Sequence, residues 1–298
     1  MNAFWALVKR NTKLFFKDKG MLFTSLITPI ILLVLYATFL ANIYRDSFLM
    51  HLGEAPIDKN VIDGCVGGQL LGSLLAVSCV TVAFCSNLLM VHDKVSNAEF
   101  DLLLTPTKKS TLAFGYYVST AIVTLIISFT AVLFGFLYLV IVGWYLSFSD
   151  VLFICLDVFL LSMFGTAISS IVNCFLTSQG QISAVGTIVS SGYGFICGAY
   201  MPLSQFPEIL QQVVSFLPGT YGTSLIRNHA MGGAFRELAK AGVSNEILAS
   251  LRDAVDCNLY FFDAKVEIWV MFCILLGSIL LLLAAFVLIQ MFKNRKRK

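Results

Sequence analysis

Charged residues are scarce in this sequence. Asp, Glu, Lys and Arg account for 12% of its 298 residues, whereas apolar residues account for 58%. Soluble domains contain roughly 25% charged and 45–50% apolar residues. The scarcity of charge therefore excludes an ordinary soluble protein and predicts an all-α polytopic membrane protein, with a single transmembrane domain over residues 1–298.

Catalytic and nucleotide-binding motifs are also missing. The sequence has no G-x-x-x-x-G-K-[ST], no H-E-x-x-H and no G-x-S-x-G, so we expect no ATP bound through a phosphate loop of this chain and no catalytic residue. Its histidines, His51, His92 and His229, are scattered and predict no metal site. The basic clusters flank membrane segments and predict no nucleic-acid partner. We therefore expect no cofactor on this chain.

Cysteine pairs at C-x-x-C spacing are absent as well. Six of the 8 cysteines lie inside apolar runs, which is typical of small core side chains. The other two, Cys65 and Cys257, lie outside such runs. If both face the same oxidising compartment they can form a disulfide, and otherwise they are free thiols.

Long apolar runs predict six membrane spans, because about 20 apolar residues cross a bilayer core as a helix. Lys and Arg concentrate before the first span, in the loop after the second span and after the last span. The positive-inside rule therefore predicts that both termini are cytoplasmic. The predicted spans cover residues 21–43, 65–91, 112–142, 151–175, 182–200 and 267–292.

Two spans carry small residues at four-residue spacing, a pattern that lets another helix approach closely. We interpret both stripes as helix-packing faces and not as catalytic signals. The positions are Gly64, Gly68, Gly72 and Ala76 around the start of the second span and Gly186, Ser190, Gly194 and Gly198 in the fifth.

Residues 1–19 are amphipathic, with Lys9, Arg10, Lys13 and Lys17 on one face of a helical wheel and apolar side chains opposite. This pattern predicts an interfacial helix on an anionic cytoplasmic leaflet. A basic flank that orients the first span is compatible with the same pattern.

A short segment after span 2 predicts a cytoplasmic helix over residues 96–104. Ser96 and Glu99 have the spacing of a capping box, and Pro106 ends the helix. Exposed apolar side chains on such a helix favour docking into a groove of a partner. An interfacial helix that contacts only lipid is the alternative. The apolar residues include Phe100, Leu103 and Leu104.

The connection after span 5 is interrupted by prolines at positions 202, 207 and 218, so no single long helix continues through it. Apolar residues at helical spacing predict one short helix between the outer two prolines and another over residues 221–227, capped by Thr220. Such helices are too short to span, which favours a re-entrant region over residues 202–229. One amphipathic helix on the outer surface is an equally open alternative. Residues 231–264 are predicted as an extracellular loop with a helix over 244–255.

Asp157 is the one charged residue well inside a predicted span. An intramembrane acid is a functional candidate, because a charge in the bilayer is costly. Asp157 lies about two helical turns from the outer end of span 4, where water or polar partners could satisfy it in a structural role. A proton-coupled transporter built on Asp157 is therefore a second hypothesis.

In combination, these features resemble the type 2 permeases of ABC transporters, including the daunorubicin-resistance type, over nearly the whole chain. The resemblance is carried by the basic amphipathic N-terminus, by the segment from Asp93 to Pro106 and by the stretch from Gly198 to His229. Ser96-Asn97 replaces the family's usual Gly-Thr, and Phe206 replaces a Leu. The matching positions are Glu99, Leu102, Leu103 and Pro106 in the segment and Pro202, Pro207, Pro218 and Arg227 in the stretch.

The resemblance implies the permease subunit of an exporter in the bacterial plasma membrane. Its cargo would be a hydrophobic or amphipathic compound, with polysaccharide or teichoic acid as the family alternative. It implies two partner ATPase subunits that bind ATP and magnesium, a second permease chain, identical or related, and surrounding membrane lipid. ATP-driven closure of the ATPases would rearrange spans 1, 2 and 5 around the pathway.

The resemblance also assigns site residues. It identifies residues 96–104 as the coupling helix that contacts the ATPase, through Ser96, Glu99, Phe100, Leu103, Leu104 and Pro106. It places a re-entrant gate at the outer side, formed by Tyr200, Pro202, Phe206, Pro207, Phe216, Pro218, Tyr221 and Arg227.

Overall fold

The computed structural model describes residues 3–52, 58–262 and 264–295. Residues 1–2, 53–57, 263 and 296–298 lie outside the described residues. They belong to the predicted N-terminal helix, the predicted outer loops and the C-terminal basic tail. The helices are α1 (Ala3–Lys17), α2 (Lys19–Leu35), the π-helical turn η1 (Tyr36–Leu40), α3 (Ala41–Leu52), α4 (Lys59–Val95), α5 (Ala98–Leu104), α6 (Lys109–Val142), α7 (Phe148–Phe175), α8 (Gln179–Ile196), the 3-10 turn η2 (Leu203–Gln205), α9 (Glu208–Ser215), α10 (Pro218–Lys240), α11 (Asn245–Ala254) and α12 (Ile268–Arg295). Strands β1 (Leu259–Phe261) and β2 (Ala264–Val266) form an antiparallel hairpin.

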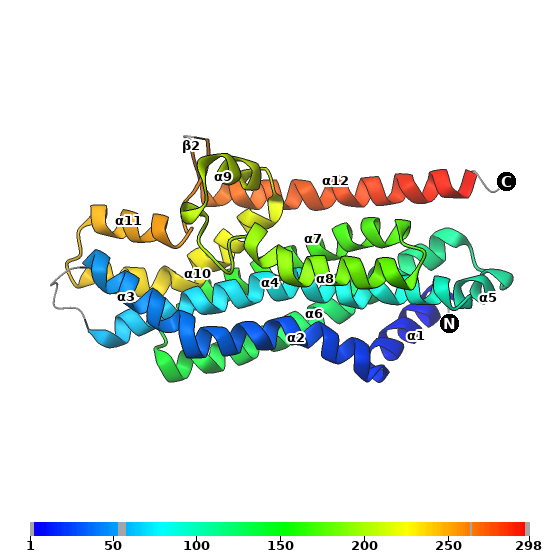
Figure 1. The fold of residues 1–298 in the computed structure, drawn as a ribbon, viewed down its shortest axis with the longest axis horizontal. Helices are drawn as coiled ribbons and strands as arrows, with labels where there is room; N and C mark the ends of the chain where they lie inside the picture. Colours follow the sequence, from blue (N-terminus) through cyan, green and yellow to red (C-terminus); the bar gives the residue numbers. More distant parts are fainter. Residues whose placement is uncertain (1–2, 53–57, 263, 296–298) are drawn as a thin grey trace.

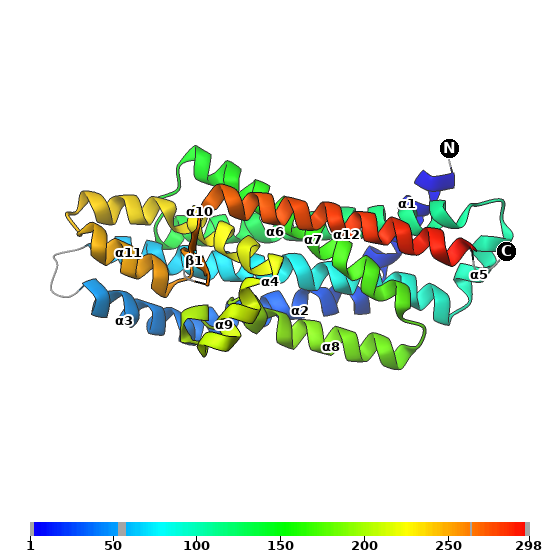
Figure 2. The same cartoon turned by 90° about the horizontal axis from the view of Figure 1, so that it is seen from above.

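The long helices run along a common axis and form an elongated bundle (Figure 1). The start of α1 and the end of α12 lie at the same end of the bundle as α5 (Figure 1). α3 and α11 lie at the opposite end (Figure 1, Figure 2).

Five helical stretches within the described residues are long and apolar enough to cross a membrane. α8, which corresponds to the predicted fifth span, has 18 residues and carries serine and threonine among its apolar residues. The all-α polytopic fold is confirmed, whereas the sixth span and the cytoplasmic position of the termini stay predictions. The five stretches are Lys19–Leu52, Lys59–Val95, Lys109–Val142, Phe148–Phe175 and Ile268–Phe292.

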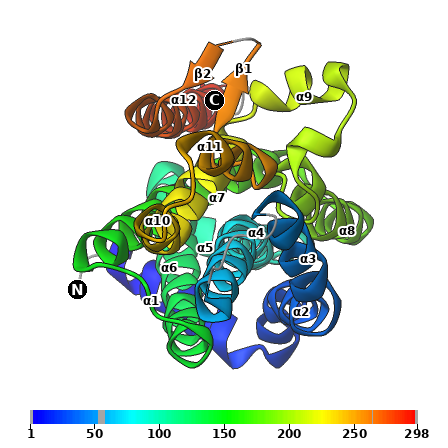
Figure 3. The ribbon, with the colours of Figure 1, turned by 90° about the vertical axis from the view of Figure 1, so that its left-hand side faces the viewer.

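α4 runs through the middle of the bundle and packs against α2, α6, α7, α8 and α10 (Figure 3). In the 18-residue stretch of α4 that is most suited to cross a membrane, 94% of the residues are buried. A Cβ atom at Gly68 would lie 2.7 Å from the carbonyl oxygen of Ala230, and one at Gly72 would lie 2.8 Å from Cγ of Arg227. Both neighbours belong to α10, so the small-residue stripe of the second span is confirmed as a helix-packing face.

The small-residue stripe of the fifth span does not pack on another described helix of this chain, and its role as a packing face stays a prediction. A Cβ atom at Gly186 would meet no atom within 4 Å. Gly194 instead leaves room for the ring of Tyr200, and Gly198 lies beyond the end of α8 with φ of 73°. The centre of this α8 face is therefore open, and its end contacts the turn that follows α8. The face does not pack on a second helix among the described residues of this chain.

Part of the apolar face of α1 contacts protein, and the position of this helix on a lipid leaflet stays a prediction. Leu7 packs with Leu112 and Tyr116 of α6. Phe15 is 1% exposed and packs with Val82 of α4. The helix is amphipathic as predicted: Leu7, Val8 and Phe15 are buried at this end of the bundle, whereas Trp5 and Leu14 are exposed.

The region after α8 differs from the predicted pair of short helices. Pro218 occupies the first turn of α10, where its fixed φ suits a helix and its missing N–H costs no hydrogen bond. Thr220 therefore lies inside α10 and does not cap it; its hydroxyl donates to the carbonyl of Val214 at 3.2 Å. α10 then continues for 23 residues to Lys240, through the start of the predicted loop.

Burial explains why this part of the predicted loop is helical. Met231, Phe235 and Leu238 are at most 2% exposed and pack with the cluster that surrounds the start of α4. The predicted helix over residues 244–255 is confirmed as α11, and the β1–β2 hairpin replaces the remainder of the loop.

The predicted capping box before α5 is not formed. Ser96 closes α4, since its N–H donates to the carbonyl of His92 at 2.9 Å. Asn97 then adopts φ of 63° and precedes α5 without a side-chain cap. Asparagine tolerates this left-handed conformation, which turns the chain sharply. α5 consequently begins at Ala98 instead of Ser96.

Candidate functional site

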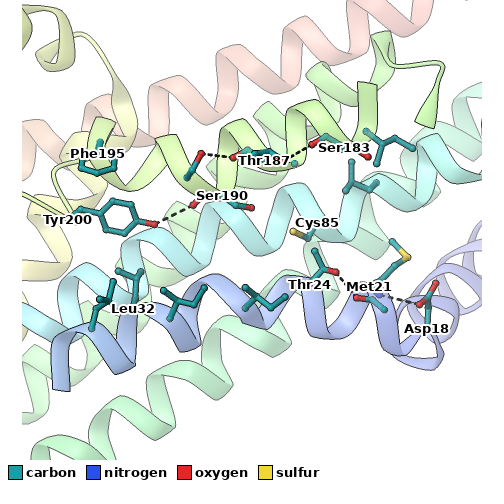
Figure 4. A pocket seen from close by; sticks show the side chains of 18 of the residues that line it. Asp18, Met21, Thr24, Leu32, Cys85, Ser183, Thr187, Ser190, Phe195 and Tyr200 are labelled. Atoms are coloured by element: carbon teal, nitrogen blue, oxygen red, sulfur yellow. Dashed lines mark hydrogen bonds between the residues drawn. The ribbon is translucent and has the colours of Figure 1, made fainter. Parts of the chain in front are cut away.

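A groove with a volume of about 1080 Å³ lies between α2 and α8, with α4 at its base (Figure 4). α2 and α8 lie along the same side of the bundle (Figure 2, Figure 3). Apolar side chains such as Ile27, Ile31 and Leu88 line most of it. These three helices correspond to spans 1, 2 and 5, the spans that the sequence analysis expects around a transport pathway.

Hydroxyl groups of α8 add a polar component to the groove. Ser183, Thr187 and Ser191 donate to backbone carbonyls one turn earlier in α8, at 3.2, 2.9 and 2.7 Å. Because each hydroxyl proton is used within the helix, the oxygens have acceptor lone pairs left for the groove. Among the described residues that line it, only Asp18 and His92 can carry a charge near neutral pH. The walls therefore offer apolar surface and hydrogen-bond acceptors without a Lys or Arg.

Tyr200 lies at the end of the groove away from Asp18 (Figure 4). Its hydroxyl donates to the carbonyl of Ser190 at 3.3 Å, and its ring contacts the edge of Phe195 with centroids 4.9 Å apart. Tyr36 of η1 lines the same end and donates its hydroxyl to the carbonyl of Ala199. Of the predicted gate residues, Tyr200 is the one that lines this groove.

The other predicted gate residues lie apart from the groove. Tyr221 and Arg227 are 2% and 0% exposed, and Pro202 is also buried. The ring of Phe216 instead contacts Phe261 of β1, with centroids 5.1 Å apart. The structure thus does not bring the predicted set together, and a pathway role for its other members stays a prediction. Three members of the same connection are half-buried or exposed: Phe206, Pro207 and Pro218.

Arg227 supports the end of the groove from inside the protein. Its NH2 group donates to the carbonyl of Gly198 at 2.5 Å and to Oγ of Ser73 at 3.0 Å. Its NH1 group donates to Asp256 at 3.0 Å, and the same carboxylate oxygen accepts the N–H of Leu203 at 2.8 Å. These bonds hold the turn after α8, which carries the tyrosine at the groove's end, against α4 and α10.

Asp157 has a histidine partner that the sequence analysis missed. The acid is fully buried on α7, and its Oδ2 lies 2.6 Å from Nδ1 of His229 on α10. The histidine ring stacks on Phe153 with centroids 4.9 Å apart. The continuation of α10 past Arg227 brings His229 to α7, a contact between distant parts of the chain that no local sequence pattern reveals. A polar partner is what a structural role for Asp157 requires, and proton coupling stays a prediction.

We expect His229→Leu to lower the free energy of unfolding by about 3–5 kcal/mol, because it leaves Asp157 buried without its partner. Adding Asp157→Asn should recover most of that loss by removing the charge. Unfolding by denaturant in mixed micelles measures both variants. Equal stability of the single and double variants would contradict a coupled pair.

α5 presents a narrower apolar surface than predicted. Phe100 and Leu104 are 62% and 71% exposed. Leu103 is half-buried and packs on the cluster that contains Leu7, and Glu99 is half-buried too. Phe100 and Leu104 are therefore the apolar side chains of α5 that are available to a partner. The remaining predicted contacts, Ser96 and Pro106, are exposed.

Cys65 and Cys257 are free, buried thiols in the structure. Burial raises the pKa of Cys257 to about 12. Little thiolate therefore forms at this site at neutral pH.

Comparison with known proteins adds one finding. A family model described as ABC-2 type transporter matches residues 2–230. The match includes α5, the three helices of the groove and the first half of α10. No curated protein matches the chain.

Proposed function

The chain belongs to the ABC-2 type transporter family, and from this membership we propose that it is the permease subunit of an ATP-driven exporter of amphipathic compounds. It is a multi-pass membrane protein, and its family implies a partner ABC ATPase. The groove between α2, α4 and α8 carries the proposal, because it combines a cargo-sized volume with walls that extend from Tyr200 toward the end of the bundle that holds α5.

The chemistry of the groove favours a neutral or cationic cargo. Apolar side chains cover most of its walls, and the α8 hydroxyls offer acceptors to a cargo that carries N–H or O–H donors. Phosphate-rich cargo is normally bound by Arg or Lys, and the described lining residues include neither. Drugs, antibiotics and lipid-like natural products fit this groove better than teichoic acid does.

The other subunits of the proposed transporter are separate chains. A second permease chain, identical or related, would cover the open side of the groove. Two ATPase subunits would bind ATP and magnesium, and Phe100 and Leu104 of α5 would contact one of them. Closure of the ATPases would push on α5 and change the width of the groove.

Phe100→Asp combined with Leu104→Asp should reduce the copurified ATPase at least tenfold, because charges would replace the exposed apolar contacts of α5. The measurement is copurification and ATP turnover after co-expression with the ABC ATPase encoded beside this chain. Glu99 and Leu103 are poorer choices, since both are half-buried.

Phe262→Asp provides the matched control. Phe262 is 53% exposed beside β1, and its φ of 53° is one that Asp tolerates. This control should retain the ATPase. If the wild-type chain retains no ATPase, the proposed function is wrong; if the α5 variant retains as much ATPase as the wild type and Phe262→Asp do, the assignment of the coupling helix is wrong.

A further inference from the structure

Two consecutive residues of the last α4 turn, Asp93 and Lys94, contact three other elements. We propose that they are positioning residues that make α1, α6 and the α7–α8 turn move together with α5. This inference rests on the proposed function, because it concerns how a push on α5 reaches the groove.

Asp93 joins α4 to α1 and α6. Both of its carboxylate oxygens accept from Arg10 of α1, at 2.7 Å to NH1 and 3.3 Å to NH2. The hydroxyl of Tyr116, from α6, donates to the same carboxylate. The Asp93 side chain is 8% exposed and that of Arg10 is 31% exposed. A bidentate, largely buried pair of this kind has a defined geometry, unlike a flexible surface ion pair.

Lys94 joins α4 to the end of α7. Its Nζ donates to the carbonyls of Asn173, Cys174 and Leu176, at 2.9, 3.3 and 3.3 Å. The last carbonyls of a helix have no partner within the helix, and a lysine there satisfies them and complements the negative end of the helix dipole. α8 begins three residues after the last of these carbonyls. Lys94 therefore holds the start of one groove wall.

The link from these residues to α5 is short and hydrogen-bonded. Only Ser96 and Asn97 separate α4 from α5. The N–H of Asn97 donates to the carbonyl of Lys94 at 3.3 Å, and its own carbonyl accepts the N–H of Phe100 at 3.0 Å. Leu102 and Leu103 also pack against the cluster that contains Leu7 of α1. A displacement of α5 is thus carried into α4 without a flexible linker that could absorb it.

The arrangement explains how one short helix could act on a groove that it does not line. Asp18, at the junction of α1 and α2, and His92, one residue before Asp93, both line the end of the groove near α5. Movement of α1 reaches α2 through Asp18, and movement of the α7–α8 turn reaches α8. Asp93 and Lys94 would therefore couple both walls of the groove to the same push.

The test measures movement directly and needs no knowledge of the cargo. The permease is assembled with its ATPase in lipid nanodiscs. Nitroxide labels are attached at Lys13→Cys on α1 and at Ala184→Cys on α8, and the exposed Cys273 is replaced by serine. Electron–electron double resonance gives the distance between the labels with and without ATP, magnesium and vanadate. We expect Asp93→Asn and Lys94→Met each to reduce the nucleotide-dependent change in distance at least twofold.

Three further variants distinguish coupling from general stability. Lys9→Gln removes a cation from an exposed position on α1 and should leave the distance change intact. Adding Arg10→Gln to Asp93→Asn should cause no further reduction, because the two residues act as one pair. Tyr116→Phe removes a single hydrogen bond and serves if Asp93→Asn fails to fold.

The outcomes separate the two hypotheses. A full distance change in both Asp93→Asn and Lys94→Met, with or without a lower thermal midpoint, overturns the coupling role and leaves the ATP-driven permease intact. A wild-type complex whose labels do not respond to nucleotide overturns the proposed function, and the coupling role with it.

Discussion

Arg227→Met is expected to lower the free energy of unfolding by about 3–5 kcal/mol, since it removes one partner of a buried ion pair. The guanidinium is fully buried and bonds Asp256, Ser73 and the carbonyl of Gly198. Its loss leaves Asp256 at 4% exposure with the backbone N–H groups of Leu203 and Ser204 as its partners. Denaturant unfolding in mixed micelles measures the difference from the wild type.

The pH dependence of that loss has a predictable sign. Burial raises the pKa of Asp256, and Arg227 opposes this effect in the wild type. Without the arginine the folded-state pKa rises further above that of the unfolded chain, so stability is lost as pH rises through the folded-state value. Arg227→Met should therefore be less destabilised at pH 5 than at pH 8. Asp256→Asn is the control, since it removes the group that titrates; an unchanged pH dependence in Arg227→Met would contradict this account.

Gly186→Trp is expected to reduce transport at least tenfold without loss of folded protein. Gly186 lines the groove, and a Cβ atom there meets nothing within 4 Å, so a tryptophan side chain at this position would begin in open space and occupy part of the groove. Efflux of a fluorescent lipophilic cation such as rhodamine 6G from proteoliposomes, with the ATPase and ATP present, measures the effect. Thermal unfolding of the same preparation tests folding.

Gly277→Trp is the matched control for the groove. Gly277 lies on α12, outside the groove, and a Cβ atom there also meets nothing within 4 Å. Its replacement by the same bulky residue should leave efflux within twofold of wild type. Equal losses in both variants would mean that the effect of Gly186→Trp comes from added bulk in the membrane region and not from a blocked groove.

Hydrophobic patterning predicted the helical membrane fold, because long apolar runs mark helices that can cross a bilayer and Gly68 and Gly72 mark a close contact between helices. It failed for α10 because the sequence from Met231 to Lys240 is only partly apolar. Its helix is stabilised by packing against α4, a contact between distant parts of the chain that local pattern does not reveal. The missing cap at Ser96 has a local cause, because the N–H of Ser96 bonds the last turn of α4.

Candidate residues were predicted where a motif is local and missed where partners meet across the bundle. The exposed apolar side chains of α5 follow from a short segment, and Phe100 and Leu104 are exposed in the structure. By contrast, the contact between Asp157 and His229 spans 72 positions. Arg227 matched a family pattern, but its burial makes it a support of the groove's end instead of a wall.

The groove has its own walls on α2 and α8 and is not an enclosed cavity. If a related but non-identical permease supplies the missing surface, recognition becomes a shared property of two gene products. A cell with several related permeases could then change its range of exported compounds by exchanging the partner, with no substitution in this chain. Selection on cargo range would act on pairs of subunits, and sequence drift at Ser183 or Thr187 would be constrained by whichever partner faces them.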